Sequence, residues 1–469
     1  SIAPGPEAGS SSGGDGGGST GVVVAIVAAV ALLGSGCLTV GLEDTTGVGA
    51  SEGTIRYVLW DSNQLPAYQK CAAAFHSKNP KIQVKIEQKG WDDYWGGLTT
   101  QFVAGNAPDV ITDHLQKYPE FMKTRQLAPL DDFIARDRVA TDIYFPGLAE
   151  LWKGQDGKTY GMPKDWDTIA IYYNKQYARD AGISEDQFAN LNWNPRDGGT
   201  FEKTVAHLTV DKSGKRGDEP GFDKDNVKVY GLGLENSGGG YGQTQWSHFA
   251  VSNGWQFLDK NPWGRQYRYD DPKLIETITW WRSLIEKGYM NSLAASASGI
   301  GLQGTFGAGK YAMTTDGSWQ IKTYNGYKGI EVGLAPLPVG PTGKRASMFN
   351  GLADSIWAGS KLKAAAWQWV KFLGSPECQN IVGQQAVVFP AIPEATQLAT
   401  RQFNSQGIVV KPFTVNVEDQ TTFLSPVTDN ASKVDAIMKP QMDAIMSFKA
   451  DPQTALPQAN QEVNALFQS

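Results

Sequence analysis

The stretch from residue 54 to residue 113 alternates between two kinds of hydrophobic spacing. TIRYVLW, KIQVKIEQ and DVIT have the composition of short strands, and the segments between them carry apolar residues at helical spacing. Strand–helix–strand–helix–strand order predicts a parallel sheet covered by helices, and therefore an α/β fold. In such sheets, ligands bind beside the carboxyl ends of the strands. Trp60, Asp61, Asp113 and His114 follow two of these ends and are candidate binding residues.

The N-terminal segment differs in composition from the rest of the chain. Residues 1–20 are rich in Gly, Ser and Pro, and an apolar run over 22–33 matches the central part of a secretory signal. Small residues and Cys37 follow, an arrangement that resembles a bacterial lipoprotein signal and implies lipidation of Cys37. An ordinary cleaved signal or an N-terminal membrane anchor is the alternative. Residues 1–37 are therefore predicted to direct export, and 38–53 to form a flexible tether.

Composition and motifs exclude several classes of protein. The net charge is −6 and no Lys/Arg-rich run occurs, so we expect no nucleic-acid partner. A G-x-G-x-x-G pattern over 299–304 does not follow a strand, and a near P-loop over 304–311 has Tyr311 where Ser or Thr is required. The four histidines lack partners at metal-ligand spacing. We expect neither cofactor nor metal. The pairing of Cys71 and Cys378 stays open.

MPKDWDTIAIYYNK, residues 162–175, places two aspartates on either side of a tryptophan. On a strand, Asp165 and Asp167 share one face, about 7 Å apart, and Trp166 lies on the other. Catalytic carboxylates of glycosidases flank the scissile bond, whereas these two would stand side by side. Side-by-side carboxylates suit the acceptance of hydrogen bonds from adjacent hydroxyl groups. Since an indole face covers the apolar C–H patch of a sugar ring, the pattern favours a sugar site.

Three stretches carry a resemblance to a known family. YGMPKDWDTIAIYYNK, YAMTTDGSW and W…VKFLGSPECQ occur in this order. They resemble landmarks of the extracellular solute-binding, maltose-binding-protein-like family, the receptors of bacterial ABC sugar importers. The resemblance covers residues 54–469 and implies a type II periplasmic-binding-protein fold, with two α/β lobes joined by crossing segments. The implied first lobe comprises 54–165 plus 352–395, the second 168–348 plus 400–469, and the crossings lie near 164–169, 348–356 and 393–401.

The resemblance also implies a function without catalysis. We expect a monomeric receptor that captures a neutral mono- or oligosaccharide by hinge closure and delivers it to the permease subunits of the importer. It would lie on the outer face of the cytoplasmic membrane by a lipid anchor, or in the periplasm. The expected ligand contacts, with Trp319 as the main stacking ring, are Trp60, Asp61, Asp113, His114, Asp165, Trp166, Asp167, Trp246, Asp316, Trp319, Asn350 and Gly351. Alternatives are a secreted carbohydrate-active enzyme using Asp165 or Asp167, and a receptor for a non-sugar solute such as a cationic amine.

Overall fold

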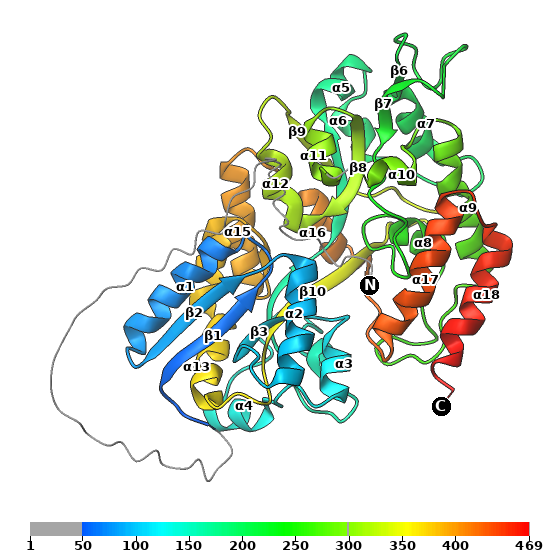
Figure 1. Cartoon of the computed structure of the whole chain (residues 1–469). Coiled ribbons are helices and arrows are strands. Elements are labelled where there is room, and N and C mark those ends of the chain that lie inside the picture. The colour runs from blue at the N-terminus through cyan, green and yellow to red at the C-terminus, as the bar shows by residue number, and fades with distance from the viewer. Residues whose placement is uncertain (1–48, 298–299, 469) are drawn as a thin grey trace, which may run out of the picture.

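A computed structural model describes residues 49–297 and 300–468 (Figure 1). The expected signal segment, Cys37 and the first part of the tether lie outside the described residues. The end of the expected tether is already part of the fold, because the Ala50 backbone N–H donates to Lys361 O and β1 begins at Gly53. No described helix combines the length and the hydropathy needed to cross a membrane.

The first sheet contains the three strands predicted near the N-terminus. Its order is β11–β4–β10–β3–β1–β2, with β12 beside β10. The strands are β1 (Gly53–Leu59), β2 (Ile82–Gln88), β3 (Val110–His114), β4 (Met162–Asp167), β10 (Ser347–Ile356), β11 (Phe389–Pro390) and β12 (Thr422–Leu424). β1 runs parallel to β2 and β3, as the alternation predicts, and β10 runs antiparallel to β3 and β4.

Helices on this sheet complete what we name the first unit. They are α1 (Leu65–Lys78), α2 (Trp91–Ala104), α3 (Tyr118–Lys123), α4 (Asp131–Asp137), η1 (Glu150–Trp152), α13 (Lys363–Leu373), α14 (Pro376–Gln385) and α15 (Pro393–Ser405). Cys71 of α1 and Cys378 of α14 form a disulfide, with Cα atoms 5.3 Å apart. The two cysteines, whose pairing the sequence left open, are 307 residues apart in the chain and link these two helices.

The second sheet, of order β6–β7–β8–β5–β9, forms the centre of the second unit. Its strands are β5 (Ile169–Asn174), β6 (Val210–Asp211), β7 (Val227–Leu232), β8 (Tyr311–Gly317) and β9 (Val332–Ala335). The helices of this unit are α5 (Lys175–Asp180), α6 (Glu185–Ala189), α7 (Gly199–Leu208), α8 (Ser247–Ser252), α9 (Pro272–Glu286), α10 (Leu293–Ser296), α11 (Gly301–Gly307), η2 (Ser318–Gln320), α12 (Ile321–Asn325), α16 (Lys411–Glu418), α17 (Ala431–Met446) and α18 (Pro452–Ala465).

Two segments of the chain connect the two sheets. Thr168 alone separates β4 of the first sheet from β5 of the second. β10 also runs between the units (Figure 1), and the Ser347 hydroxyl at its start bonds both backbone groups of Ile169. The third expected crossing, 393–401, is instead part of α15, which packs on α14 and β11 of the first unit. The chain enters the second unit only after α15, where α16 packs on β5.

Candidate functional site

The first crossing carries both aspartates of the MPKDWD stretch. In the β4–β10 ladder, Asp167 pairs with Asn350 and Asp165 with Leu352, whereas Pro163 pairs with Ala353. This shift leaves Lys164 as an extra residue in β4. Bulges of this kind redirect a side chain, and Lys164 consequently turns toward the centre of the first sheet.

The two carboxyl groups on this strand are buried and poorly satisfied. Asp165 Oδ1 accepts the backbone N–H of Leu352 at 3.2 Å, and Asp165 Oδ2 has no hydrogen-bond partner among the described residues. Asp167 Oδ1 accepts the Ser318 hydroxyl at 3.4 Å. Burial raises the pKa of Asp165 to about 7, and burial together with the charges of Asp165 and Asp61 raises the pKa of Asp167. Both carboxyl groups are therefore protonated at a higher pH than exposed aspartates.

Lys164 is the basic side chain of this region, and its ammonium is already engaged. Nζ lies 3.3 Å from Asp354 Oδ1 and 3.3 Å from Thr112 Oγ1, and it also donates to the Tyr57 hydroxyl. The ammonium stands 4.0 Å from the centre of the Tyr68 ring. Sequence reasoning did not select Lys164, because nothing in an alternating strand pattern reveals a bulge.

Asp61, directly after β1, extends the acidic character of the crossing. Its Oδ2 accepts the Gln64 side-chain amide at 2.7 Å, and its Oδ1 accepts the Asn63 backbone N–H at 2.9 Å. Burial raises its pKa to about 6, and its charge raises the pKa of both Asp165 and Asp167. We refer to Asp61, Asp165 and Asp167 as the carboxyl cluster.

Trp60 and His114 border the cluster within the first unit. The Trp60 ring packs against those of Trp91 and Tyr94, with centroids 5.1 and 5.0 Å away, and its Nε1 has no described partner. His114 Nε2 lies 2.9 Å from Asn350 Nδ2, which links β3 to β10. Burial lowers the His114 pKa to about 3, so the imidazole is neutral at physiological pH.

Trp319 brings a second indole to the crossing from the second unit. The Ser318 backbone N–H donates to Thr168 O at 3.0 Å, which holds η2 against the crossing residue. The Trp319 ring lies against Gly317, where a Cβ would come within 2.0 Å of it, so only glycine permits this approach. Trp319 Nε1 is buried without a partner, and no aromatic ring of the described residues packs on this indole.

Four predicted ligand contacts are engaged elsewhere in the fold. The Asp113 carboxyl accepts the Ser355 hydroxyl and the His114 backbone N–H. Trp166 lies on the opposite face of β4, stacked on Phe389 at 4.7 Å. Trp246 and Asp316 lie inside the second unit, where Trp246 Nε1 donates to Ser237 O and the Asp316 carboxyl accepts the Tyr324 hydroxyl and the Gln303 amide. These side chains form packing and hydrogen bonds within the protein.

Eight predicted residues lie together around the crossing. They are Trp60, Asp61, His114, Asp165, Asp167, Trp319, Asn350 and Gly351. Gly351 lies opposite Trp166 in the ladder, and a Cβ there would come within 3.1 Å of Asp165 O. The contacts run from the end of β1 through β3, β10 and β4 to η2, and therefore include both units.

Sequence reasoning missed two buried amides near this region. Neither amide atom of Gln243 has a hydrogen-bond partner among the described residues, and the same holds for Gln116 Oε1. Gln243 precedes Thr244, whose backbone carbonyl accepts the Thr315 hydroxyl of β8. A glutamine in a glycine-rich loop carries no pattern from which such a position could be predicted.

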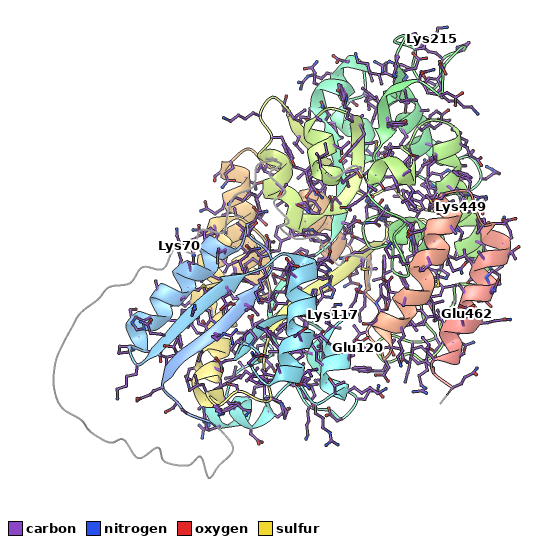
Figure 2. All side chains as sticks on the ribbon, viewed as in Figure 1. Lys70, Lys117, Glu120, Lys215, Lys449 and Glu462 are labelled. Carbon is purple, nitrogen blue, oxygen red and sulfur yellow. A yellow bond between two sulfur atoms is a disulfide. The ribbon has the colours of Figure 1, made fainter. Side chains whose placement is uncertain are left out.

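Side chains of the two units also meet directly. Asn63 Nδ2 donates to Thr323 Oγ1 at 3.0 Å, which joins the loop after β1 to α12. Gln116 Nε2 donates at 3.2 Å to Ser425 Oγ, which directly follows β12 of the first sheet. Glu120 of α3 lies close to one end of α17 (Figure 2) and accepts two hydrogen bonds from Ser432.

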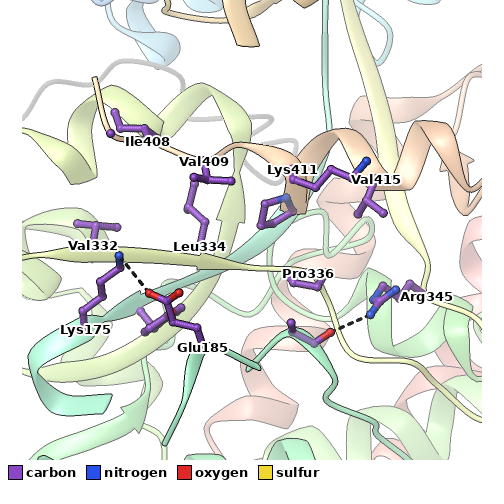
Figure 3. A pocket seen from close by; sticks show the side chains of 14 residues that line it. Lys175, Glu185, Val332, Leu334, Pro336, Arg345, Ile408, Val409, Lys411 and Val415 are labelled. Atoms are coloured by element: carbon purple, nitrogen blue, oxygen red, sulfur yellow. Dashed lines mark hydrogen bonds and ion pairs between the residues drawn. The ribbon is translucent and has the colours of Figure 1, made fainter. Parts of the chain in front are cut away.

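Open pockets lie away from the carboxyl cluster. One of about 400 Å³ runs beside the edge strand β9, below residues 407–411, and has Val332, Leu334 and Val409 in its lining (Figure 3). Its Lys175 pairs with Glu185 at 3.4 Å, and its Arg345 donates to Ala189 O. Its lining contains none of the predicted ligand residues. Another pocket, of about 410 Å³, has Trp166, Pro393 and Thr396 in its lining.

The family model of a bacterial extracellular solute-binding protein matches residues 70–408. The chain belongs to this family. This solute-binding protein is 24% identical to a putative binding protein of Brucella abortus, over 89% of this chain and 94% of that protein. It is 23% identical to the galactooligosaccharide-binding protein of Bacillus subtilis, over 92% and 93% of the two chains. The resemblance inferred from the three landmark stretches is therefore confirmed.

Solved structures confirm the fold of the solute-binding protein. Mycobacterium tuberculosis UspC superposes with a TM-score of 0.68 at 24% identity, over 88% of this chain and 100% of that one. An ABC substrate-binding protein from Listeria monocytogenes, in complex with cycloalternan, gives a TM-score of 0.75 at 20% identity, over 88% and 98%. The predicted two-lobed α/β class, with sheets flanked by helices, is thus confirmed.

Proposed function

We propose that this chain is the saccharide receptor of a bacterial ABC importer, with the ligand held where its two units meet. The observation that carries the proposal is the gathering of the carboxyl cluster with two indoles, Trp60 and Trp319, around the first crossing. Relatives named for galactooligosaccharide and maltooligosaccharide binding support a sugar as the ligand.

The chemistry of the site matches a polyhydroxylated ring. Asp165 Oδ2 offers a free acceptor, and the Nε1 atoms of Trp60 and Trp319 offer free donors. A sugar hydroxyl both donates and accepts, so it can satisfy groups of both kinds. In this proposal the Trp319 indole, on which no described aromatic ring packs, stacks on the apolar face of a pyranose.

The two units act as the lobes of the receptor in this proposal. The first lobe comprises 54–165 and 352–405, since α15 packs with α14, and the second comprises 168–348 and 411–469 except β12, which pairs with β10. A ligand that binds one lobe and gains contacts with the other on closure shifts the equilibrium toward the closed form. The closed receptor, a monomer, then docks on the permease subunits. Cys37 carries the lipid that retains it at the membrane, on the outer face.

The site favours binding over catalysis. Asp165 and Asp167 lie on one face of β4, side by side, whereas a glycosidase pair brackets the bond to be broken. Incubation with oligosaccharides is therefore expected to leave their chain length unchanged. Release of reducing ends that disappears in Asp167→Asn would support the enzyme instead.

The decisive experiment is a titration of the purified protein with a panel of mono- and oligosaccharides. Heat exchange is recorded by calorimetry, and indole fluorescence is recorded in parallel. At least one saccharide is expected to bind with both signals saturating at the same concentration, because Trp60 and Trp319 both border the site. Absence of binding across the panel would contradict the proposal.

A further inference from the structure

A solvent-open pocket of the second unit lies outside the proposed saccharide site. Its volume of about 400 Å³ falls in the range of small-molecule sites, roughly 300–1,000 Å³. Residues 332–336, which include β9, form one wall, and residues 407–415, which include the start of α16, form the other (Figure 3). We refer to the space between these two segments as the β9 pocket.

The walls of the β9 pocket are aliphatic. Val332 and Leu334 lie on one face of β9, because side chains two residues apart on a strand point to the same side. Leu334 points toward Val409 of the opposite wall (Figure 3), which Ile408 and Val415 extend. None of these five side chains is fully buried, and Val409 is 64% exposed. A hydrocarbon chain bound here would therefore remove apolar surface from water.

Arg345 brings a positive charge to this lining without an anionic partner. Its Nε donates to Leu337 O at 2.8 Å, and its Nη2 donates to Ala189 O at 3.1 Å. Both acceptors are neutral backbone carbonyls, and no carboxylate of the described residues forms an ion pair with this guanidinium. The two bonds fix the orientation of the side chain, and its remaining N–H groups can donate to a ligand.

The other basic side chains of the lining are already paired. Lys175 Nζ lies 3.4 Å from Glu185 Oε1, and Lys411 forms an ion pair with Glu418. Among the described residues of the lining, Arg345 is therefore the cation that lacks a carboxylate. A ligand that complements this pocket has an apolar body and one negative charge.

We propose that the β9 pocket is a second binding site, which takes a small molecule with a carboxylate on an aliphatic chain. The carboxylate accepts hydrogen bonds from Arg345, whose planar guanidinium matches two oxygens, and the chain lies between Leu334 and Val409. The lining contains none of the residues assigned to the saccharide site, so this inference does not rest on the proposed function.

The test compares ligands that differ in charge or in chain length. Octanoate, octanol and hexanoate are titrated by calorimetry into the purified, saccharide-free protein near neutral pH. We expect octanoate to bind at least about tenfold more tightly than octanol, because it adds a charge-assisted hydrogen bond. Hexanoate should bind roughly tenfold more weakly than octanoate, because it buries two methylene groups fewer. Octanoate that binds no more tightly than octanol or hexanoate, or not at all, would overturn the inference.

A pair of charge-matched variants locates the effect. Arg345→Gln removes the charge but keeps a side-chain amide, and it should abolish the preference for octanoate over octanol. Arg179→Gln removes the same charge from α5 of the same unit, where Arg179 pairs with Glu331 at 2.9 Å outside the lining. The preference for octanoate should persist in this control.

Val409→Asp probes the opposite wall at an exposed position. The new negative charge should weaken octanoate binding more than octanol binding, and this variant replaces Arg345→Gln if the latter does not fold. An octanoate preference that stays unchanged in either variant contradicts the proposed site. Saccharide binding is measured separately and involves other residues, so failure of this site leaves the proposed function standing.

Discussion

At the scale of single residues, the two tryptophans beside the crossing have opposite roles. Trp319 leaves its Nε1 without a described hydrogen-bond partner, and no described aromatic ring packs on it, whereas Trp166 is stacked on Phe389 and donates to Thr396. Trp319→Phe should weaken saccharide binding about tenfold, because phenylalanine loses the donor and part of the stacking area. Calorimetric titration of the purified variant measures this loss.

The matched control for this substitution is Trp166→Phe. Its ring lies on the opposite face of β4, so the change should leave saccharide affinity within about twofold while lowering the melting temperature through the lost hydrogen bond to Thr396. If Trp166→Phe weakens binding as much as Trp319→Phe, the assignment of the two faces of β4 is wrong.

The raised pKa of Asp165 predicts a pH dependence of stability. A carboxyl that titrates at about 7 when folded, and at about 4 when unfolded, binds more protons in the native state between these values. The free energy of unfolding therefore falls as pH rises from about 4 to about 7, by on the order of 1 kcal/mol per unit. In Asp165→Asn this contribution disappears, and ligand-free denaturant melts at pH 5 and pH 7.5 should differ less than in the parent protein.

Loss of the Asp165 charge also lowers the pKa of Asp167, which reduces the pH dependence in the same direction, and the buried histidines do not disturb the comparison. Burial lowers the pKa of His114 and His248 to about 3. Their contribution to the free energy of unfolding is therefore lost as pH falls below the histidine pKa of the unfolded chain, which is opposite in direction to the effect of Asp165. They are present in both proteins and cancel in the difference. If the free energy of unfolding depends on pH identically in the parent and in Asp165→Asn, the assignment of a raised pKa to Asp165 is refuted.

Residue-level prediction from the sequence succeeded where periodicity alone decides the outcome. The period of two on a strand places Asp165 and Asp167 on one face and Trp166 on the other, as the structure shows. Lys164 could not be predicted, because its orientation depends on a register shift against β10, a strand almost two hundred residues away in sequence. The position of the Trp246 indole could not be predicted for a related reason, since a glycine-rich loop gives no sign of where this side chain packs.

At the scale of secondary-structure elements, α17 begins with a cap from the other unit. Its Ncap residue, Asn430, makes no side-chain cap. Glu120 of α3 instead accepts the Ser432 backbone N–H at 2.7 Å and the Ser432 hydroxyl at 2.9 Å (Figure 2). A carboxylate at a helix N-terminus is stabilised by the free N–H groups and by the helix dipole. This contact holds the two units together without touching the carboxyl cluster.

Removal of the Glu120 cap should therefore favour separation of the units. In Glu120→Ala, the ligand-free protein is expected to show a larger radius of gyration in X-ray scattering and a several-fold weaker apparent saccharide affinity. Ser432→Ala completes a double-mutant cycle, whose coupling energy should be about 1–2 kcal/mol. Additive effects of the two substitutions would show that the pair does not contribute to closure.

The disulfide between α1 and α14 predicts a different outcome. Cys71 and Cys378 lie within the first unit, both fully buried, so replacement of the pair by serine should lower the free energy of unfolding by about 2–4 kcal/mol. Chemical denaturation measures this loss. Saccharide affinity at 25 °C should be retained, since neither sulfur borders the crossing. If the replacement weakens saccharide binding without lowering the free energy of unfolding, the disulfide contributes to the ligand site and not to stability, contrary to this expectation.

Elements were predictable where local spacing and tertiary structure agree. The strands and helices from β1 to β3 follow their hydrophobic spacing. The third crossing was misplaced because Pro393 begins a helix that packs on α14, and no local pattern shows which unit a helix joins.

At the scale of the whole molecule, two units share one ligand site through short connections. Thr168 is the single residue between β4 and β5, and its hydroxyl bonds Phe413 O of α16, so the first and third passages between the units lie together. Motion about these connections changes the distance between the units while each keeps its own sheet. Closure is therefore expected to be a rigid-body movement.

Fluorophores on opposite units measure this movement. Lys70 lies on α1 of the first unit and Lys215 in an exposed turn of the second (Figure 2). With cysteine at both positions, a saturating saccharide should change the energy transfer between the dyes, because ligand contacts from both units favour one relative orientation. A second pair, at Lys70 and Lys361 within the first unit, should give constant transfer. If both pairs change, the units deform instead of moving as rigid bodies; if neither changes although calorimetry shows binding, the saccharide binds without hinge closure.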